Sequence, residues 1–248
     1  MSIQLADGFR ILEGDELTGD HLKQLFDAVL RNSIPADELM SLTDILKVYA
    51  SPDRRDPAAV VTDAEGRVVA GMLSEIYPAS RVLLVGYLAA RHDVRGQGLG
   101  SALVRQCLHR WRSQTSASMV LLEIDDPRCH AAADGYGDPR ARVRFYDRFG
   151  AVVLPFPYFQ PALYPDSSRV DGMLLISIVD PSETTVEAAT ITEFLNEYFT
   201  ACEGAAAASD DGLARLIQSV LSQSVDGRLP VYPLRDFAAA VSNEGTQA

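Results

Sequence analysis

Residues 88–111 read LAARHDVRGQGLGSALVRQCLHRW, and this stretch decides the fold. It begins as an apolar strand, turns through a basic loop with glycines at 96, 98 and 100, and continues as an amphipathic helix. Glycine has no Cβ, so the backbone can approach a ligand closely, and the unpaired N–H groups of a helix start attract anions. Arg95 adds a positive charge beside them. The stretch therefore predicts a pyrophosphate-binding loop.

Three kinds of loop bind phosphates in this way. The loop of nucleoside triphosphatases requires a Gly-Lys-Ser/Thr ending, which this chain lacks. A dinucleotide-binding loop is the closer alternative, because Glu123 lies about twenty residues on and offers a carboxylate for a ribose hydroxyl. However, Ser101 stands where that loop has its third glycine. The remaining pattern, Arg/Gln-x-x-Gly-x-Gly/Ala, is matched by residues 95–100.

That pattern is the acyl-CoA loop of the GCN5-related N-acetyltransferases (GNAT), and the chain resembles this family. Residues 141–151, ARVRFYDRFGA, look like a second family signature, a short helix with a Phe-Tyr pair that ends at a glycine. The resemblance implies acetyl-CoA as co-substrate and no metal. It places the pantetheine arm on the backbone of Leu88 and Ala90. The pyrophosphate then falls on the loop residues Arg95, Gly96, Gln97, Gly98, Leu99, Gly100 and Ser101.

The resemblance implies an α/β fold with a mixed, mostly antiparallel sheet, helices on both faces and a splayed central strand pair. Periodicity along the chain agrees with this fold. Helices are predicted at residues 20–30, 37–49, 98–113 and 138–150. Strands are predicted at residues 3–12, 60–62, 68–76, 82–90, 119–124, 152–154 and 173–179. The proline-rich aromatic segment 155–165 is unsuited to a central strand.

Residues 1–180 are predicted to form the acetyltransferase domain, and residues 181–248 a C-terminal helical extension. Thr184 and Glu187 suggest a capping box at its start. Two apolar stripes at helical spacing follow, Ile191, Phe194, Leu195, Tyr198 and Phe199, then Leu213, Leu216, Ile217, Val220 and Leu221. Such stripes must be covered, so the extension is expected to pack on the core, or to serve as a lid or a homodimer element.

Composition limits the partners and the location. The net charge of −12 excludes a broad nucleic-acid surface, and 10 acidic residues against 3 arginines lie in residues 181–248. The longest apolar run is too short to span a membrane, and the first residues do not look like a signal peptide, so a cytoplasmic location is expected. The three scattered cysteines predict neither a disulfide framework nor a metal site.

The resemblance also assigns catalytic roles. Tyr146 matches the family's tyrosine that protonates the departing sulfur, the alternative being a core aromatic. Many members carry a Glu or His base on the central strand, where this chain has Leu84 and Gly86. Another group must then accept the amine proton, unless the amine arrives neutral. Glu123 is the first choice, on the strand after the loop helix.

Three further residues are candidate substrate contacts. Asp125 shares a strand face with Glu123, Glu75 ends the preceding hairpin, and Tyr158 lies in the aromatic segment that is expected either to line an acceptor pocket or to cover the core. Cys129 beside His130 offers a covalent alternative, although such pairs are normally assembled in space and not by adjacency.

The predicted function is acetyl or acyl transfer from CoA to a primary amine of a small molecule, by direct attack in a ternary complex. Two alternatives remain open. The chain could be a non-catalytic acyl-CoA sensor or scaffold, because the strand base is missing, or an N-acetyltransferase of proteins or peptides. Turnover distinguishes the first alternative, and the shape of the acceptor pocket distinguishes the second.

Overall fold

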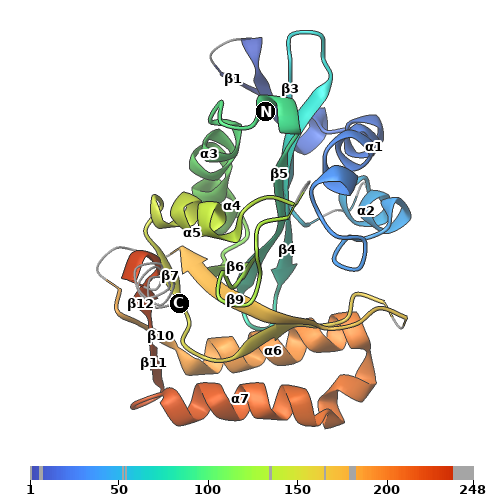
Figure 1. The fold of residues 1–248 in the computed structure, drawn as a ribbon. Helices are drawn as coiled ribbons and strands as arrows, with labels where there is room; N and C mark the ends of the chain where they lie inside the picture. The colour runs from blue at the N-terminus through green and yellow to red at the C-terminus, as the bar shows by residue number, and fades with distance from the viewer. Residues whose placement is uncertain are drawn as a thin grey trace. The chain divides into compact units, whose positions relative to one another are not determined.

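The structure, a computed structural model, describes residues 2–5, 8–51, 53, 55–133, 136–164, 166–178 and 183–236. The predicted boundary at 180/181, position 179 of the last predicted strand and Pro165 lie outside these residues. The chain divides into two compact units (Figure 1). Unit 1 comprises Met1–Ile76 and Leu83–Ala117, and unit 2 comprises Tyr77–Val82 and Ser118–Ala248.

The strands of unit 1 follow the order β1-β2-β3-β4-β5. The pairs β1–β2, β2–β3 and β3–β4 are antiparallel. In the turn between β3 and β4, Asp63 accepts hydrogen bonds from the N–H groups of Glu65 and Arg67, and Gly66 has a φ of +79°. This confirms the predicted hairpin. The strands are β1 (Ser2–Gln4), β2 (Arg10–Glu13), β3 (Ala58–Thr62), β4 (Val68–Tyr77) and β5 (Val82–Ala90).

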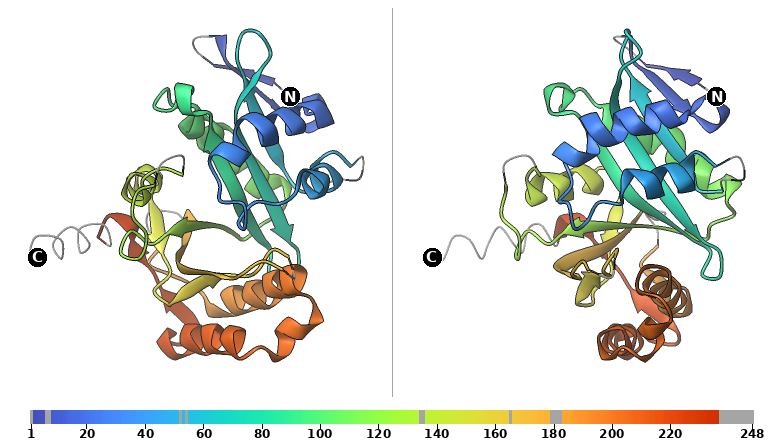
Figure 2. Two further views of the ribbon diagram at one scale, coloured as in Figure 1. Left: turned by 45° about the vertical axis from the view of Figure 1, so that its right-hand side comes forward. Right: turned by 90° about the vertical axis from the view of Figure 1, so that its right-hand side faces the viewer.

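Helices cover both faces of these strands. Figure 2 shows α1 (Gly19–Ala28) and α2 (Leu42–Tyr49) on one face, and on the other the continuous helical run of α3 (Leu99–Leu103), the π-turn η5 (Val104–Leu108) and α4 (His109–Gln114). The sequence places a cap at Asp20, but the Thr18 hydroxyl caps the first helix instead, and the helix therefore begins at Gly19. Ser41 caps α2, so the residues from 37 to 41 precede that helix.

In unit 2 the strand order is β6-β9-β7-β12, and β8 also pairs with β9. The pairs β6–β9, β7–β9, β8–β9 and β7–β12 are antiparallel. β8 lies within the proline-rich segment, whose prolines flank a strand of only 3 residues. The strands are β6 (Met119–Asp125), β7 (Ala151–Val153), β8 (Tyr158–Gln160), β9 (Val170–Ile178) and β12 (Tyr232–Pro233), with the separate pair β10 (Thr185–Glu187) and β11 (Arg228–Pro230).

The helices of unit 2 are α5 (Pro139–Asp147), α6 (Ala188–Glu203) and α7 (Asp211–Gln223). Asp138 caps α5 as predicted, and Gly150 follows it with a φ of +72°. The predicted capping box at Thr184 and Glu187 is wrong. Residues 185–187 pair with β11 instead, and no side chain caps α6. Glu187, which a capping box would place inside the helix, is therefore the last residue of a strand.

The first apolar stripe of the extension is buried within unit 2, whereas in the second Leu213, Leu216 and Val220 are buried and Leu221 is exposed. Phe194 and Tyr198 of α6 contact Tyr77, and Phe199 contacts Phe159, with ring centroids 5.3–5.5 Å apart. Glu197 accepts hydrogen bonds from residues 79 and 80 in the turn before β5. β12 continues the sheet beyond β7. None of the helices in the described part of the chain has the length and apolarity that crossing a bilayer requires.

Candidate functional site

The predicted phosphate loop lies between the end of β5 and the start of α3, after the short helix η4 (His92–Val94). Gly96 and Gly98 have φ values of +84° and +81°, a conformation that other residues adopt at a cost. A Cβ built on either glycine would meet no atom within 4 Å. The backbone of this loop is therefore left-handed at two positions and faces open space.

The helix that follows begins without a side-chain cap. Gly98 is its N-cap residue, no side chain accepts a hydrogen bond there, and the first turn holds no acidic residue. The N–H groups of Leu99, Gly100 and Ser101 belong to the first turn, which has no carbonyl partners inside the helix. Uncapped donors, a positive dipole end and a backbone free of side chains fit a pyrophosphate such as that of acetyl-CoA.

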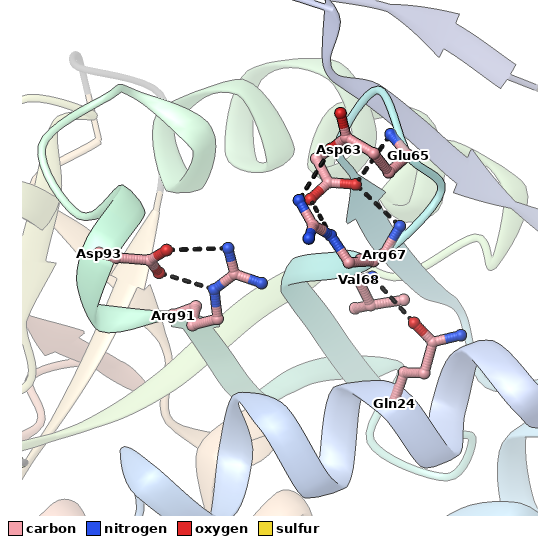
Figure 3. A network of polar contacts seen from close by, with 7 residues as sticks. All are labelled: Gln24, Asp63, Glu65, Arg67, Val68, Arg91 and Asp93. Carbon is pink, nitrogen blue, oxygen red and sulfur yellow. Dashed lines mark hydrogen bonds and ion pairs between the residues drawn. The ribbon is translucent and has the colours of Figure 1, made fainter.

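The arginines beside this loop make defined contacts. Arg95 donates to the Ser33 hydroxyl at 3.0 Å and to the Ala90 carbonyl at 3.2 Å, which ties the loop to the end of β5. Arg91 forms a two-point pair with Asp93 at 2.6 and 2.8 Å (Figure 3). The same view shows the hairpin turn in which Arg67 pairs with the carboxylates of residues 63 and 65. The side chain of Arg95 thus holds the loop in shape.

In unit 2, Glu123 is the centre of a hydrogen-bonded cluster. It pairs with Leu175 in β9, and Tyr158 of β8 pairs with Met173, so the two side chains project from the same face on opposite sides of β9. The Tyr158 hydroxyl donates to Glu123 Oε1 at 2.5 Å. Gln160 donates to Glu123 Oε2 at 3.3 Å. The structure thus brings together two of the predicted site residues.

A third donor comes from the C-terminal helix α6. The Tyr198 hydroxyl lies 3.0 Å from Glu123 Oε2 and donates to it. Burial, and next the charge of Glu123, hold the pKa of Tyr158 and of Tyr198 well above the usual phenol value, so both stay protonated donors. Sequence reasoning missed Tyr198 because it stands in an apolar stripe. The sequence feature that could have indicated it is the hydroxyl in an otherwise apolar stripe, because a buried hydroxyl needs a hydrogen-bond partner.

A pocket of about 360 Å³ lies beside this cluster within unit 2. It is lined by Ala162, Tyr164, Ser167, Arg169, Cys202 and Glu203. Ala162 follows Gln160 of the cluster by two residues, and Cys202 stands one helical turn after Tyr198 on α6, so the pocket adjoins the cluster. Arg169 pairs with Glu203 at 2.5 Å and with Asp210 at 2.9 Å. Residues of the predicted aromatic segment thus line a cavity.

Tyr146 lies on α5, buried and packed edge-to-face against Phe145 at 4.9 Å. Burial raises its pKa to about 12, although the charge of Arg142 lowers it in part. An unperturbed phenol has a pKa of about 10. The higher value secures the proton over the physiological range but reduces the driving force for its transfer. Among the described residues, none hydrogen-bonds the Tyr146 hydroxyl.

Asp125 and Glu75 have different surroundings. Asp125 accepts a hydrogen bond from Arg142 at 2.5 Å, one helical turn before Tyr146, and so connects β6 to α5. Glu75 lies on β4 in unit 1, near the buried Tyr49, whose pKa is raised first by burial and next by the charge of Glu75. The structure therefore places Asp125 with Tyr146 and leaves Glu75 in the other unit.

The remaining candidate residues lie in β5 and in the segment that follows β6. Leu84 is buried in β5, and a Cβ on Gly86 would meet no atom within 4 Å. Cys129 is exposed, and His130 Nε2 lies 3.0 Å from the carbonyl oxygen of Asp171. Within the described residues, no group of three or more His, Cys, Asp or Glu side chains is placed to hold a metal ion.

A profile of the acetyltransferase (GNAT) family matches residues 25–151, which is half of the chain. The chain belongs to the GNAT family. The GNAT match includes the phosphate loop, β6 and α5 with Tyr146, and it ends before Tyr158 and α6. The protein is accordingly an N-acetyltransferase with a mostly antiparallel GNAT sheet and C-terminal helices, as its sequence predicts. Members of this family generally use acetyl-CoA.

A solved structure shows the same GNAT fold. A structure assigned to the GNAT acetyltransferases, from Bacteroides thetaiotaomicron, is 17% identical, covers 77% of this chain and 98% of its own, and has a TM-score of 0.52. The ribosomal-protein-S18-alanine N-acetyltransferase of Escherichia coli is 14% identical over 71% and 97% of the two chains, with a TM-score of 0.46. A search of curated protein sequences found no match.

Proposed function

We propose that this GNAT protein transfers an acetyl group from acetyl-CoA to a primary amine of a small molecule, by direct attack in a ternary complex. The observation that carries the donor assignment is the uncapped helix start behind Gly96 and Gly98. A side chain at either glycine would occupy the open space in front of the backbone. The loop residues 95–101 would hold the pyrophosphate, and the backbone of Leu88 and Ala90 would hold the pantetheine arm.

Bound acetyl-CoA supplies the acetyl group as a thioester. Glu123 takes one proton from the ammonium form of the acceptor, so that the nitrogen attacks as a neutral amine. The C–N bond forms as the C–S bond breaks, and the Leu88 N–H donates to the oxygen that gains charge. Tyr146 donates its phenolic proton to the departing sulfur. The acylated nitrogen still carries a second proton and releases it to solvent, the Tyr146 phenolate takes up one proton, and protonated Glu123 releases one, so that the amide, the CoA thiol and one proton are the net products.

The pocket beside Tyr158 supports a small acceptor. Its volume of about 360 Å³ is at the low end of the range for small-molecule sites. Arg169 and Glu203 line it, and Asp210 pairs with Arg169 from outside the lining, so this group of three charges carries one net negative charge, which favours a cationic amine. Glu75 and Asp125 remain candidates for further contacts with the acceptor. A homodimer and a cytoplasmic location complete the proposal.

A thiol-release assay tests the proposed function. Acetyl-CoA is offered with a panel of polyamines, amino acids, aminoglycosides and peptides, and free CoA is measured. We expect turnover with one class of small primary amines. Turnover with peptides alone would replace the small-molecule acceptor by a protein substrate. CoA binding without turnover on any amine would support the sensor alternative instead.

A further inference from the structure

Tyr198 lies outside the part of the chain that the GNAT profile matches, and yet it contacts the candidate base. Its hydroxyl donates to Glu123 Oε2 at 3.0 Å, while Tyr158 donates to Oε1 at 2.5 Å. Each oxygen of the carboxylate therefore receives a phenol. A carboxylate that is bound at both oxygens is fixed in rotation, and donors of this kind favour its ionised form.

The position of Tyr198 is itself well determined. Its ring stacks on Phe194 with centroids 5.4 Å apart and an interplanar angle of 25°, and it meets Tyr77 edge-on at 5.4 Å. On the same helix, Glu197 accepts hydrogen bonds from the N–H groups of Ala79 and Ser80. A ring held between two others has little rotamer freedom, so its hydroxyl points steadily at the carboxylate.

We propose that Tyr198 is a positioning residue for acyl transfer. From helix α6 it holds the Glu123 carboxylate in the orientation and charge state in which Glu123 accepts the proton of the acceptor amine. This inference rests on the proposed function, because it takes Glu123 to be the base. It gives the C-terminal helix a part in the reaction in addition to covering the sheet.

The test is the dependence of kcat/KM on pH, measured with one amine for all variants so that ionisation of the acceptor contributes equally. In Tyr198→Phe the carboxylate loses one charge-assisted hydrogen bond. We expect the acidic limb of the kcat/KM profile to move to higher pH by about one unit. We also expect kcat to fall about tenfold, while KM for acetyl-CoA stays unchanged. A 3-fluorotyrosine at position 198 keeps the packing but donates more strongly, so its limb should move to lower pH.

Ile191→Val is the matched control, because it alters the packing of a buried residue of the same helix, two turns before Tyr198, without removing a polar group. It should lower the melting temperature and leave the acidic limb in place. An unmoved limb in both Tyr198 variants overturns the inference, even where activity falls, because Tyr198 is then a packing residue only.

Glu123→Gln separates this inference from the proposed function. Wild-type turnover in Glu123→Gln overturns the role of Glu123 as base, and that of Tyr198 with it. Loss of turnover in Glu123→Gln together with an unmoved limb in the Tyr198 variants overturns only the role of Tyr198. Loss of turnover together with opposite shifts in Tyr198→Phe and the fluorinated protein supports both.

Discussion

The phosphate loop of unit 1 and the Glu123 cluster of unit 2 are built in opposite ways. The loop consists of consecutive backbone groups, and its chemistry comes from two left-handed glycines and a helix start. The cluster consists of side chains from β6, β8 and α6. Tyr158 and Tyr198 lie 35 and 75 residues after Glu123 in the chain. The first site should therefore depend on backbone freedom, and the second on single functional groups.

The largest effect of removing one functional group is expected at Tyr146. Tyr146→Phe keeps the ring but removes the proton, so kcat should fall by roughly 10²–10⁴-fold while the affinity for CoA barely changes. Steady-state kinetics and titration calorimetry measure the two quantities. Phe145→Leu is the control, because it alters the neighbouring ring and leaves the hydroxyl in place. Wild-type turnover in Tyr146→Phe would assign the residue to packing.

The second prediction concerns stability at high pH. Burial raises the pKa of Tyr146 to about 12, and also raises that of Tyr49, Tyr158 and Tyr198. The folded state then holds protons that the unfolded state releases near pH 10, so stability is fully present below pH 10 and decreases as pH rises through 12. Urea unfolding between pH 8 and 11 should show this decrease.

In Tyr146→Phe the same decrease should be shallower, because one of the phenols that prefer the folded state is gone. The part of the tyrosinate absorbance that comes from the buried phenols should rise together with unfolding and not before it. A folded protein whose buried phenols titrate at pH 10 would contradict the burial of this group.

The contrast also explains which features could be predicted from the sequence. The turn at Gly96 and Gly98, the strand at residues 82–90 and the start of α5 depend on neighbouring residues, and their patterns predict these conformations correctly, while the binding role of the loop stays a prediction. The splayed central strand pair involves strands of different units and stays a prediction. So do the roles of Tyr146 and Glu123 and the boundary between the acetyltransferase domain and the extension.

Features that depend on distant partners were missed. The hydroxyl of Tyr198 reaches Glu123 because the chain folds α6 against β8, where Phe199 meets Phe159, and no local sequence pattern predicts that contact. Residues 184–187 show a capping-box pattern, but pairing with residues 228–230 makes 185–187 a strand. The short strand Tyr158–Gln160 lies between prolines and forms because it pairs with β9, which its own residues do not indicate. In each case long-range pairing outweighs local preference.

The smallest effect is expected at the edge of the pocket. Glu203 binds Arg169 through both oxygens at 2.7 and 2.5 Å, and this pairing lowers the pKa of Glu203. Glu203→Gln should therefore cost about 1.5–3 kcal/mol of unfolding free energy at pH 7. Because the folded-state pKa is lowered, the difference from wild type should disappear as pH falls below 4.5. Urea unfolding of the variant and the wild type at pH 7 and below pH 4.5 measures this difference.

The control for this variant is Glu193→Gln on the exposed face of the same helix. It should leave stability within about 0.5 kcal/mol of wild type. Equal losses in the two variants would mean that the pairing with Arg169 contributes nothing specific.

Calorimetric titration of acetyl-CoA into Gly98→Val and Gly66→Val tests the central claim most directly. Both glycines have a φ near +80° and open space at the Cβ position, so the two variants suffer similar backbone strain. Only Gly98 lies on the phosphate loop. The backbone account predicts that Gly98→Val loses acetyl-CoA binding while Gly66→Val binds as wild type does. Undiminished binding by a folded Gly98→Val protein would contradict it.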